Sequence, residues 1–431
     1  MVHRLEYYFD KLWPICRSIT GNGVRETLRI ISEIIPLNIY EVPSGTKVFD
    51  WEVPKEWNIT DAYVLSPDGE KVIDFKLNNL HIVNYSIPVD IEISFEELNN
   101  HLYYIEDYPD AIPYITSYYN ENWGFCLSYN QYKILPKVGK YRVVINSSLK
   151  NGSMTYGDYV LQGESEKEVL LSTYTCHPSM ANNELSGILV LSFLYEKLKS
   201  IPNRKLTYRF IFAPETIGAI NYLNKHGLHL KRNLKAGFII TCVGDSGKFN
   251  FKNSRDKNNS INKLIRHVFK NEGVKYNNLP FNVLGSDERQ YSSPGFNLPV
   301  VSITRSIYHS YREYHTSKDC KDFISFTSIL ETIEVYLKVF KALELNNFYY
   351  NQNPFCEPQL GKRGMYPKIG AARKHPKSIL RTMLALNFSD GNHDLVDIAE
   401  IGDDSIFDYE EIINQLIEKK LLDLKKNIEW N

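Results

Sequence analysis

Residues 165–345 alternate between short apolar runs and longer stretches in which apolar positions recur at helical spacing. The apolar runs predict four buried strands, at 169–176, 206–213, 236–243 and 298–304. Helical spacing extends from Leu185 to Lys199, and a long helix is predicted over 324–345. This alternation predicts an α/β fold with a mostly parallel mixed sheet and helices on both of its faces.

The chain on either side of this region follows different patterns. Residues 1 to about 35 predict two helices, and short alternating runs punctuated by proline and glycine then predict a β-rich module ahead of the main sheet. Trp51, Trp57 and Trp123 of this module either line a substrate groove or belong to the core of the module. Three amphipathic helices near the carboxyl end resemble a winged-helix domain, at 378–387, 394–401 and 409–422.

A length of 431 residues exceeds what a single compact core organises. We therefore predict an α/β domain formed by residues 1–40 and 160–350, into which the β-rich module of residues 41–159 is inserted. Residues 351–431 are predicted to form a connector and the winged-helix-like domain. The connector is rich in Pro, Gly and Lys as far as Pro376.

The charge balance excludes a general electrostatic attraction to nucleic acid or to an anionic membrane. Lys and Arg number 50 against 51 for Asp and Glu, a net charge of -1. Between Asp390 and Glu411 there are nine acidic residues and no Lys or Arg, so this part of the tail repels a phosphate backbone. We therefore expect neither nucleic-acid nor membrane partners.

The six cysteines are scattered without a C-x-x-C pair, and the first twenty residues carry charges and no apolar secretory signal. No stretch is long and apolar enough to span a membrane. These features predict a cytoplasmic protein with reduced thiols.

Polar residues follow the ends of the predicted strands. They are His177, Glu215 and Asp245, with His315 after a longer loop. The carboxyl ends of strands in an open α/β sheet line one crevice, so we expect these side chains to meet there. A lone histidine at such a position is more often structural, but imidazole and carboxylate together are the ligands of a catalytic zinc ion. A further carboxylate can act as general base.

Three segments resemble the zinc-dependent aminopeptidase family, also described as di-zinc exopeptidases. They are His177 with Ala181–Gly187, then Pro214–Gly218, then Tyr314–Asp319. The whole chain is similar to a bacterial group of aminopeptidase-like proteins that combines this peptidase domain with an inserted β module and a carboxyl-terminal winged helix. The resemblance implies a zinc-exopeptidase-like sheet and a link to polysaccharide biosynthesis.

The sequence departs from the family pattern at two carboxylates. Asn183 stands where the family has a metal-bridging Asp, and Thr216 replaces the second Glu of a Glu-Glu pair. An amide is a much poorer zinc ligand than a carboxylate. We therefore expect one zinc ion rather than two.

The resemblance implies that His177 and His315 hold this ion together with one carboxylate. Glu184 is slightly preferred as the third ligand and Asp245 competes with it. The structural alternative for Glu184 is a carboxylate that stabilises the start of the following helix. Glu215 matches the general base of the family.

Three further residues are candidates for substrate binding. Arg289 and Asp287 precede the fourth strand and could bind a substrate carboxylate and amino group, or pair with each other. Tyr314, next to His315, could steady the substrate.

These assignments predict a metallo-aminopeptidase or a related metal-dependent amidohydrolase that cleaves an amide bond in a small peptide or an acylated metabolite. The alternative is a catalytically degenerate peptidase fold that serves as a binding or scaffold protein. The β-rich module and the acidic tail are expected to shape access to the cleft or to mediate association into a homo-oligomer.

Overall fold

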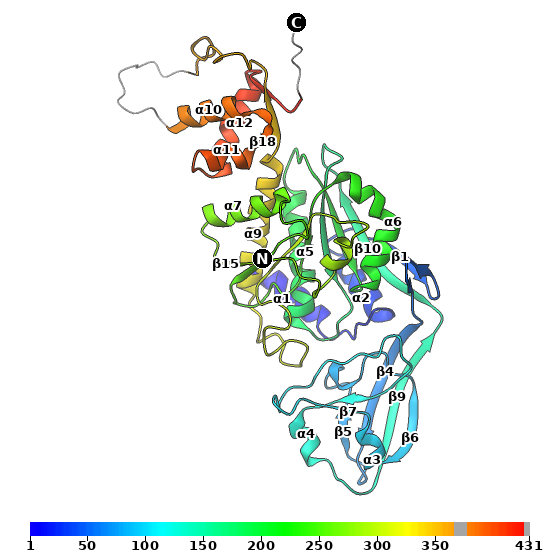
Figure 1. Cartoon of the computed structure of the whole chain (residues 1–431). Coiled ribbons are helices and arrows are strands. Elements are labelled where there is room, and N and C mark those ends of the chain that lie inside the picture. The colour runs from blue at the N-terminus through cyan, green and yellow to red at the C-terminus, as the bar shows by residue number, and fades with distance from the viewer. Residues whose placement is uncertain (366–376, 426–431) are drawn as a thin grey trace. The chain divides into compact units, whose positions relative to one another are not determined.

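The computed structural model of the chain describes residues 1–365 and 377–425. The chain forms two compact units, and Figure 1 labels many of their elements. The first unit consists of residues 1–257 and 276–333, and the second of residues 258–275 and 334–431. Part of the predicted connector, residues 366–376, lies outside the described residues.

The first unit is built on an eight-stranded mixed sheet with the strand order β1-β10-β12-β11-β13-β16-β14-β15. The central strands β12, β11, β13 and β16 are parallel to one another, and the antiparallel pairs lie toward the edges. The strands are β1 (Asn38–Pro43), β10 (Ser153–Leu161), β11 (Glu168–Tyr174), β12 (Thr207–Ala213), β13 (Leu234–Ile239), β14 (Phe249–Lys252), β15 (Tyr276–Leu279) and β16 (Val300–Thr304).

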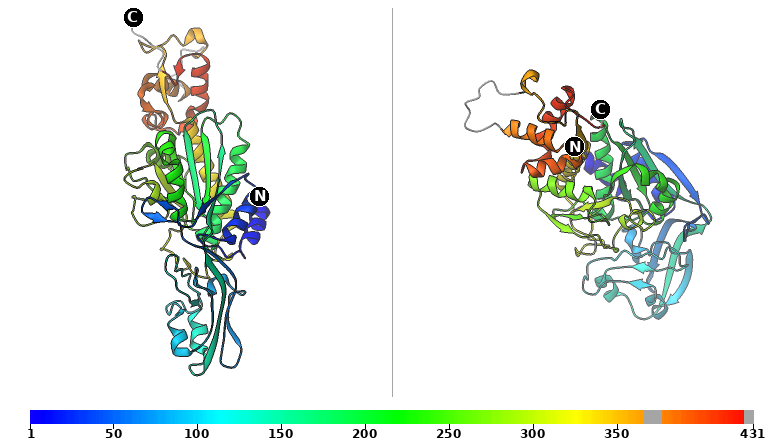
Figure 2. Two further views of the ribbon diagram at one scale, coloured as in Figure 1. Left: turned by 90° about the vertical axis from the view of Figure 1, so that its right-hand side faces the viewer. Right: turned by 45° about the horizontal axis from the view of Figure 1, so that its top comes forward.

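Helices lie on both faces of this sheet (Figures 1 and 2). Every residue of β11 and β12 is buried, as expected for strands that are covered on both faces. The helices that begin in this unit are α1 (Val2–Leu12), α2 (Asn22–Ile31), α5 (Ser186–Lys199), α6 (Ile217–Asn233), α8 (Glu288–Tyr291) and α9 (Phe326–Leu345). The predicted fold class is confirmed.

The β-rich module contains a four-stranded antiparallel sheet with the order β5-β4-β9-β6. Trp57 is part of its core, since it is buried and its indole N–H donates to the carbonyl of Ser86, whereas Trp51 is 40% exposed. The elements of the module are β2 (Lys47–Val48), β3 (Trp51–Glu52), β4 (Glu56–Leu65), β5 (Lys71–Asp74), β6 (Val89–Ser94), α3 (Phe95–Asn99), β7 (Leu102–Tyr103), β8 (Phe125–Cys126), α4 (Tyr129–Ile134) and β9 (Lys140–Lys150).

The second unit contains the three predicted tail helices and a small three-stranded sheet. Lys263 on helix α7 pairs with Asp394 and Asp397, which explains why residues 258–275 group with the tail. The elements are α7 (Ser260–Asn271), β17 (Phe348–Asn351), α10 (Lys377–Phe388), β18 (Asp390–Asp394), α11 (Leu395–Ile401), α12 (Glu410–Glu418) and β19 (Leu422–Asp423). Across the described parts of both units, none of the helices has the length and apolar character needed to cross a membrane.

Candidate functional site

The chain leaves β11 at Tyr174 and enters a fully buried turn, residues 177–187, that carries His177 and Glu184. One turn of π-helix, Ala181–Leu185, precedes α5. A π-turn holds one residue more than an α-turn, and such turns are frequent at functional sites. The turn therefore displays polar side chains at the carboxyl edge of the sheet instead of continuing directly into the helix.

Glu184 holds His177 in place from one side. Its Oε2 accepts hydrogen bonds from the backbone N–H and from Nδ1 of His177, both at 3.1 Å. Its Oε1 lies 3.3 Å from Nε of Arg17, whose guanidinium is fully buried and also donates to the His177 carbonyl. The two opposite charges thus compensate each other inside the protein.

A proton on Nδ1 that is donated to Glu184 leaves the lone pair on Nε2 of His177. Nε2 lies 3.9 Å from Oε2 of Glu215. Burial lowers the pKa of His177, but the hydrogen bond and charge of Glu184 outweigh it, so the pKa is raised above its usual value. His177 therefore directs a basic nitrogen toward Glu215.

Glu215 follows β12 in a strained turn. Thr216 has φ 65°, in the left-handed region that β-branched residues rarely adopt. Its backbone N–H donates to Asp287 at 2.7 Å, and its hydroxyl lies 3.3 Å from Nη2 of Arg289. The Ser286 hydroxyl donates to Oε1 of Glu215 at 2.7 Å. The 286–289 segment thus fixes the Glu215 carboxylate with Oε2 facing His177.

Asp287 is buried beside this turn. Burial raises the pKa of Asp287 well above its usual range, and the nearby charge of Glu215 raises it further. Arg289 is exposed at the rim. Its contact is with Thr216, and no ion pair joins Arg289 to Asp287 within the described part of the chain.

His315 lies in the loop 305–319 and has φ 53°. The inserted module holds it there through three backbone contacts. The N–H of Tyr114 donates to the His315 carbonyl at 2.8 Å, the N–H of Ser317 to the Ile112 carbonyl at 2.8 Å, and the N–H of Ile112 to the Ser317 hydroxyl at 3.0 Å. The module therefore contributes directly to the position of this histidine.

The centroids of the His177 and His315 rings lie 5.3 Å apart. Two imidazoles bound to one tetrahedral zinc ion, with Zn–N near 2.1 Å, have centroids about 5 Å apart. Nε2 of His315 is buried and has no hydrogen-bond partner among the described residues. Burial lowers the pKa of His315 to about 2, with His177 and His309 adding to the effect, so this imidazole is neutral, as a metal ligand must be.

Aromatic side chains enclose the two histidines. The Tyr114 ring lies 5.2 Å from both imidazoles, and its hydroxyl is 2.9 Å from that of Tyr118. Tyr314 stacks on His315 at 3.9 Å, and burial raises its pKa. Phenol groups thus surround the space next to the imidazoles.

Asp245 and Asn182 lie at the same edge but are saturated by hydrogen bonds. The carboxylate of Asp245 accepts from the Asn182 amide, from the backbone N–H of Gly247, and from both the N–H and the hydroxyl of Ser306. The side-chain Oδ1 of Asn182 in turn accepts from the backbone N–H groups of Gly244 and Asp245. These hydrogen bonds join the turn that carries Asn182 to the segments around Asp245 and Ser306, so their role is structural.

Asn183 of the π-turn is also engaged. Its Oδ1 accepts from the Tyr174 hydroxyl at 2.9 Å, while its Nδ2 is buried without a partner in the described chain. Asp319 accepts from the N–H groups of Asn182 and Asn183 and so stabilises the start of the π-turn.

The predicted residues His177, Glu184, Glu215 and His315 therefore lie together, and Asp287, Arg289 and Tyr314 border them. A compact group of possible metal donors is formed by Cys176, His177 and Glu184. Burial raises the pKa of the Cys176 thiol well above its usual value, which disfavours a thiolate there. Arg17, Tyr114 and Tyr118 also belong to the site, but they are far away in sequence and carry no motif that would have identified them.

Solved structures of zinc aminopeptidases share this architecture. BSAP, a zinc aminopeptidase from Bacillus subtilis, superimposes with a TM-score of 0.55 at 11% identity, covering 78% of this chain and 93% of that chain. The fold is therefore that of an aminopeptidase-like α/β protein.

Matches from Clostridium acetobutylicum are much more similar. A "putative polysaccharide biosynthesis protein with aminopeptidase-like domain" is 50% identical over 390 residues, which cover 90% of this chain and 89% of the relative. The crystal structure of a "putative peptidase" is 45% identical with a TM-score of 0.90, covering 98% of this chain and 96% of that chain. The chain belongs to the family defined by the domain of unknown function DUF4910, matched over residues 7–346, and carries a winged helix-turn-helix domain, matched over 347–424.

Proposed function

We propose that this protein is a metal-dependent hydrolase of aminopeptidase type that cleaves an amide bond in a small peptide or an acylated metabolite. The observation that carries the proposal is the pair of imidazoles, 5.3 Å apart, with a buried Nε2 of His315 that has no partner in the described chain. Buried polar atoms without partners are rare in proteins and often mark the place of an ion or a water molecule. The aminopeptidase-like fold and the names of the relatives support the same class of chemistry.

The residues fit one zinc ion better than two. His177 and His315 would hold the ion with Glu184 as the candidate carboxylate, and the amide of Asn183 weakens a second position. The contacts of Glu184 support an orienting role, because it receives the Nδ1 proton of His177 and its charge is compensated by Arg17. A ligand role for Glu184 remains the prediction to be tested.

A bound zinc ion would supply Lewis acidity and lower the pKa of a water molecule to about 7. Glu215 is placed to take the proton of the attacking water on Oε2 and to return it to the leaving amine, while Ser286 occupies Oε1. The hydroxyl pair of Tyr114 and Tyr118 can donate to the oxygen that becomes negative during attack.

Substrate contacts follow from the position of the remaining side chains. Arg289 is exposed at the rim and can form a bidentate pair with a substrate carboxylate. Asp287 is turned toward the N–H of Thr216, so we propose that it positions the Glu215 turn, with the binding of a substrate amino group as its second role. Tyr314, stacked on His315, forms one wall.

The test combines metal content with activity. Purified protein is expected to hold about one equivalent of zinc and to hydrolyse members of a panel of aminoacyl-anilides and acetylated amino sugars. His177→Ala should lose both, whereas Glu215→Gln should keep the metal and lose hydrolysis. Full zinc retention in His177→Ala would contradict the site.

The second candidate is a degenerate peptidase fold that binds a ligand without cleaving it. The replacement of two family carboxylates by Asn183 and Thr216 favours it. Absence of both zinc and hydrolysis, with ligand binding intact, would support this function instead. For either function we propose a cytoplasmic setting and a link to polysaccharide biosynthesis. The name of the Clostridium relative supports the link to polysaccharide biosynthesis.

A further inference from the structure

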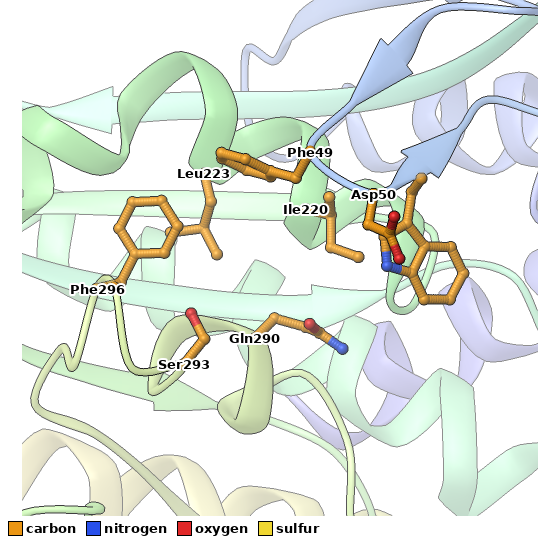
Figure 3. Close-up of a pocket in the computed structure, with 9 residues that line it drawn as sticks. Phe49, Asp50, Ile220, Leu223, Gln290, Ser293 and Phe296 are labelled. Atoms are coloured by element: carbon orange, nitrogen blue, oxygen red, sulfur yellow. The ribbon is translucent and has the colours of Figure 1, made fainter.

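One cavity in the first unit is lined mainly by aromatic and aliphatic side chains. Its volume is about 390 Å³, within the range of small-molecule sites, and it lies between the β2–β3 hairpin, helix α6 and the segment after α8 (Figure 3). The lining residues are Phe49, Asp50, Trp51, Ile220, Leu223, Gln290, Ser293, Gly295 and Phe296. None of them is used by the chemistry described above.

The hairpin that forms one wall is strained at Phe49. Residues 49 and 50 form a two-residue loop between the pairs Val48–Trp51 and Lys47–Glu52, and Phe49 has φ 53°. A positive φ at the first loop position is normally adopted by glycine. Phe49 is also 64% exposed, so burial of its ring does not compensate for the strain. Strain of this kind is concentrated at ligand-binding sites.

The opposite wall is preformed. The Phe296 ring meets the Phe49 ring edge to face at 5.9 Å, and it lies directly against Gly227 of α6. A Cβ at position 227 would collide with the ring, so the glycine permits this close approach. The cavity is therefore fixed by backbone packing on this side.

Three polar groups of the lining are not engaged elsewhere. In the described part of the chain the Asp50 carboxylate, the Gln290 amide and the Ser293 hydroxyl form no side-chain hydrogen bond or ion pair. Figure 3 shows Asp50 and Gln290 toward one end of the cavity and Phe296 with Leu223 toward the other. Exposed aromatic faces combined with free acceptors and donors match a ring that has an apolar C–H face and hydroxyl groups at its edge.

The chain connects two walls of the cavity to the Glu215 turn. Ile220 lies three residues after the start of α6 at Ile217, which is a rise of about 4.5 Å, and α6 begins directly after the Glu215–Thr216 turn. Gln290 follows Arg289, which contacts Thr216. Two walls of the cavity are therefore continuous with the segments that hold Glu215.

We infer that this cavity binds the pyranose ring of an N-acylated amino sugar whose amide is the bond presented to Glu215. The ring lies against Phe49 and Trp51, and its hydroxyls bind Asp50, Gln290 and Ser293. The binding of the sugar stands on the cavity alone, whereas its role as substrate rests on the proposed function.

The experiment is calorimetric titration of the full chain with N-acetylglucosamine, together with saturation-transfer NMR. Saturable binding is expected, and Leu223→Trp, which fills the cavity, should abolish it. The matched control is Leu228→Trp on the same helix, where the native side chain is 76% exposed. This variant should bind the sugar as the unchanged protein does. Phe49→Gly should weaken binding about three- to tenfold while thermal stability is equal or higher, because glycine relieves the strained φ.

Each outcome decides the inference. Absence of saturable binding, equal binding in Leu223→Trp, or tighter binding of N-acetylphenylalaninamide than of the sugar would overturn it. Sugar binding that persists in His177→Ala would support the cavity even if no variant hydrolyses the amide, and in that case only the proposed function fails.

Discussion

The turn 177–187 and the loop 305–319 each present one histidine to the same space, yet they are stabilised differently. Every residue of the turn is buried, and charged and backbone partners surround it. No residue from 306 to 315 is fully buried, and His315 is held by backbone contacts to the inserted module. The turn therefore belongs to the buried core of the first unit, whereas the geometry of the loop depends on its contacts with the β-rich module.

The two imidazoles differ in the same way. Glu184 raises the pKa of His177, whereas burial lowers that of His315 to about 2 and leaves its Nε2 without a partner in the described chain. A neutral imidazole with an unpartnered Nε2 can bind a cation without first losing a proton. The comparison thus predicts that changes in the turn reduce the stability of the fold and that changes in the loop reduce metal binding.

The largest effect is expected from His315→Ala. This change removes a proposed ligand from a loop that contributes little to the core, so zinc should be lost while the unfolding temperature of the metal-free protein stays the same. Elemental analysis and calorimetry measure the two quantities. The control is His309→Ala in the same loop, which should retain zinc; equal zinc content in His315→Ala would contradict the role of the loop.

Arg17→Met tests the opposite side of the comparison. The change leaves the buried Glu184 carboxylate uncompensated, and breaking a buried ion pair of this kind costs about 3–5 kcal/mol in the free energy of unfolding. Urea denaturation of metal-free protein provides the measurement. The control Arg29→Met removes an exposed arginine of α2 and should leave stability nearly unchanged. If both variants were equally stable, the turn would not be the more firmly held region.

The positions of His177 and Glu215 at the edge of the sheet could be predicted from sequence. Continuous apolar runs identified β11 and β12, and the residues that follow them, His177 and Glu215, had to lie at one edge of the sheet. These predictions depend on local patterns. Helical spacing likewise located α5 and the tail helices.

The remaining parts of the site depend on contacts between distant segments. Arg17 meets Glu184 across 167 positions and Tyr114 meets His315 across 201, with no local pattern to indicate either contact. Asp245 had the right residue type at a strand end, but backbone N–H groups and Ser306 already occupy its oxygens. The sequence indicates which polar residues lie at the edge of the sheet. It does not indicate which of them keep a donor or acceptor atom without a partner there.

Glu184→Gln distinguishes a ligand from an orienting carboxylate. If Glu184 orients His177 through Nδ1, zinc affinity should fall about 10- to 100-fold while binding remains measurable. If Glu184 is itself a ligand, the loss should match that of His315→Ala. Competition with a chromogenic chelator gives the affinity. Asp245→Asn, at the saturated carboxylate, should leave the affinity unchanged.

The smallest effect is expected where the module meets the loop, at Ser317→Ala. The Ser317 hydroxyl accepts the N–H of Ile112 at 3.0 Å, and its loss leaves one hydrogen bond unmade, which costs about 1 kcal/mol. The hydrogen bonds between the module and the loop also hold His315, so this cost should reduce the zinc affinity about fivefold. The urea midpoint of the metal-free protein should stay nearly constant. Ser310→Ala, which removes an exposed hydroxyl of the same loop, should change neither quantity. A shift of the urea midpoint without any change in zinc affinity would mean that the module supports the fold and not the metal, and the contrast between turn and loop would then be wrong.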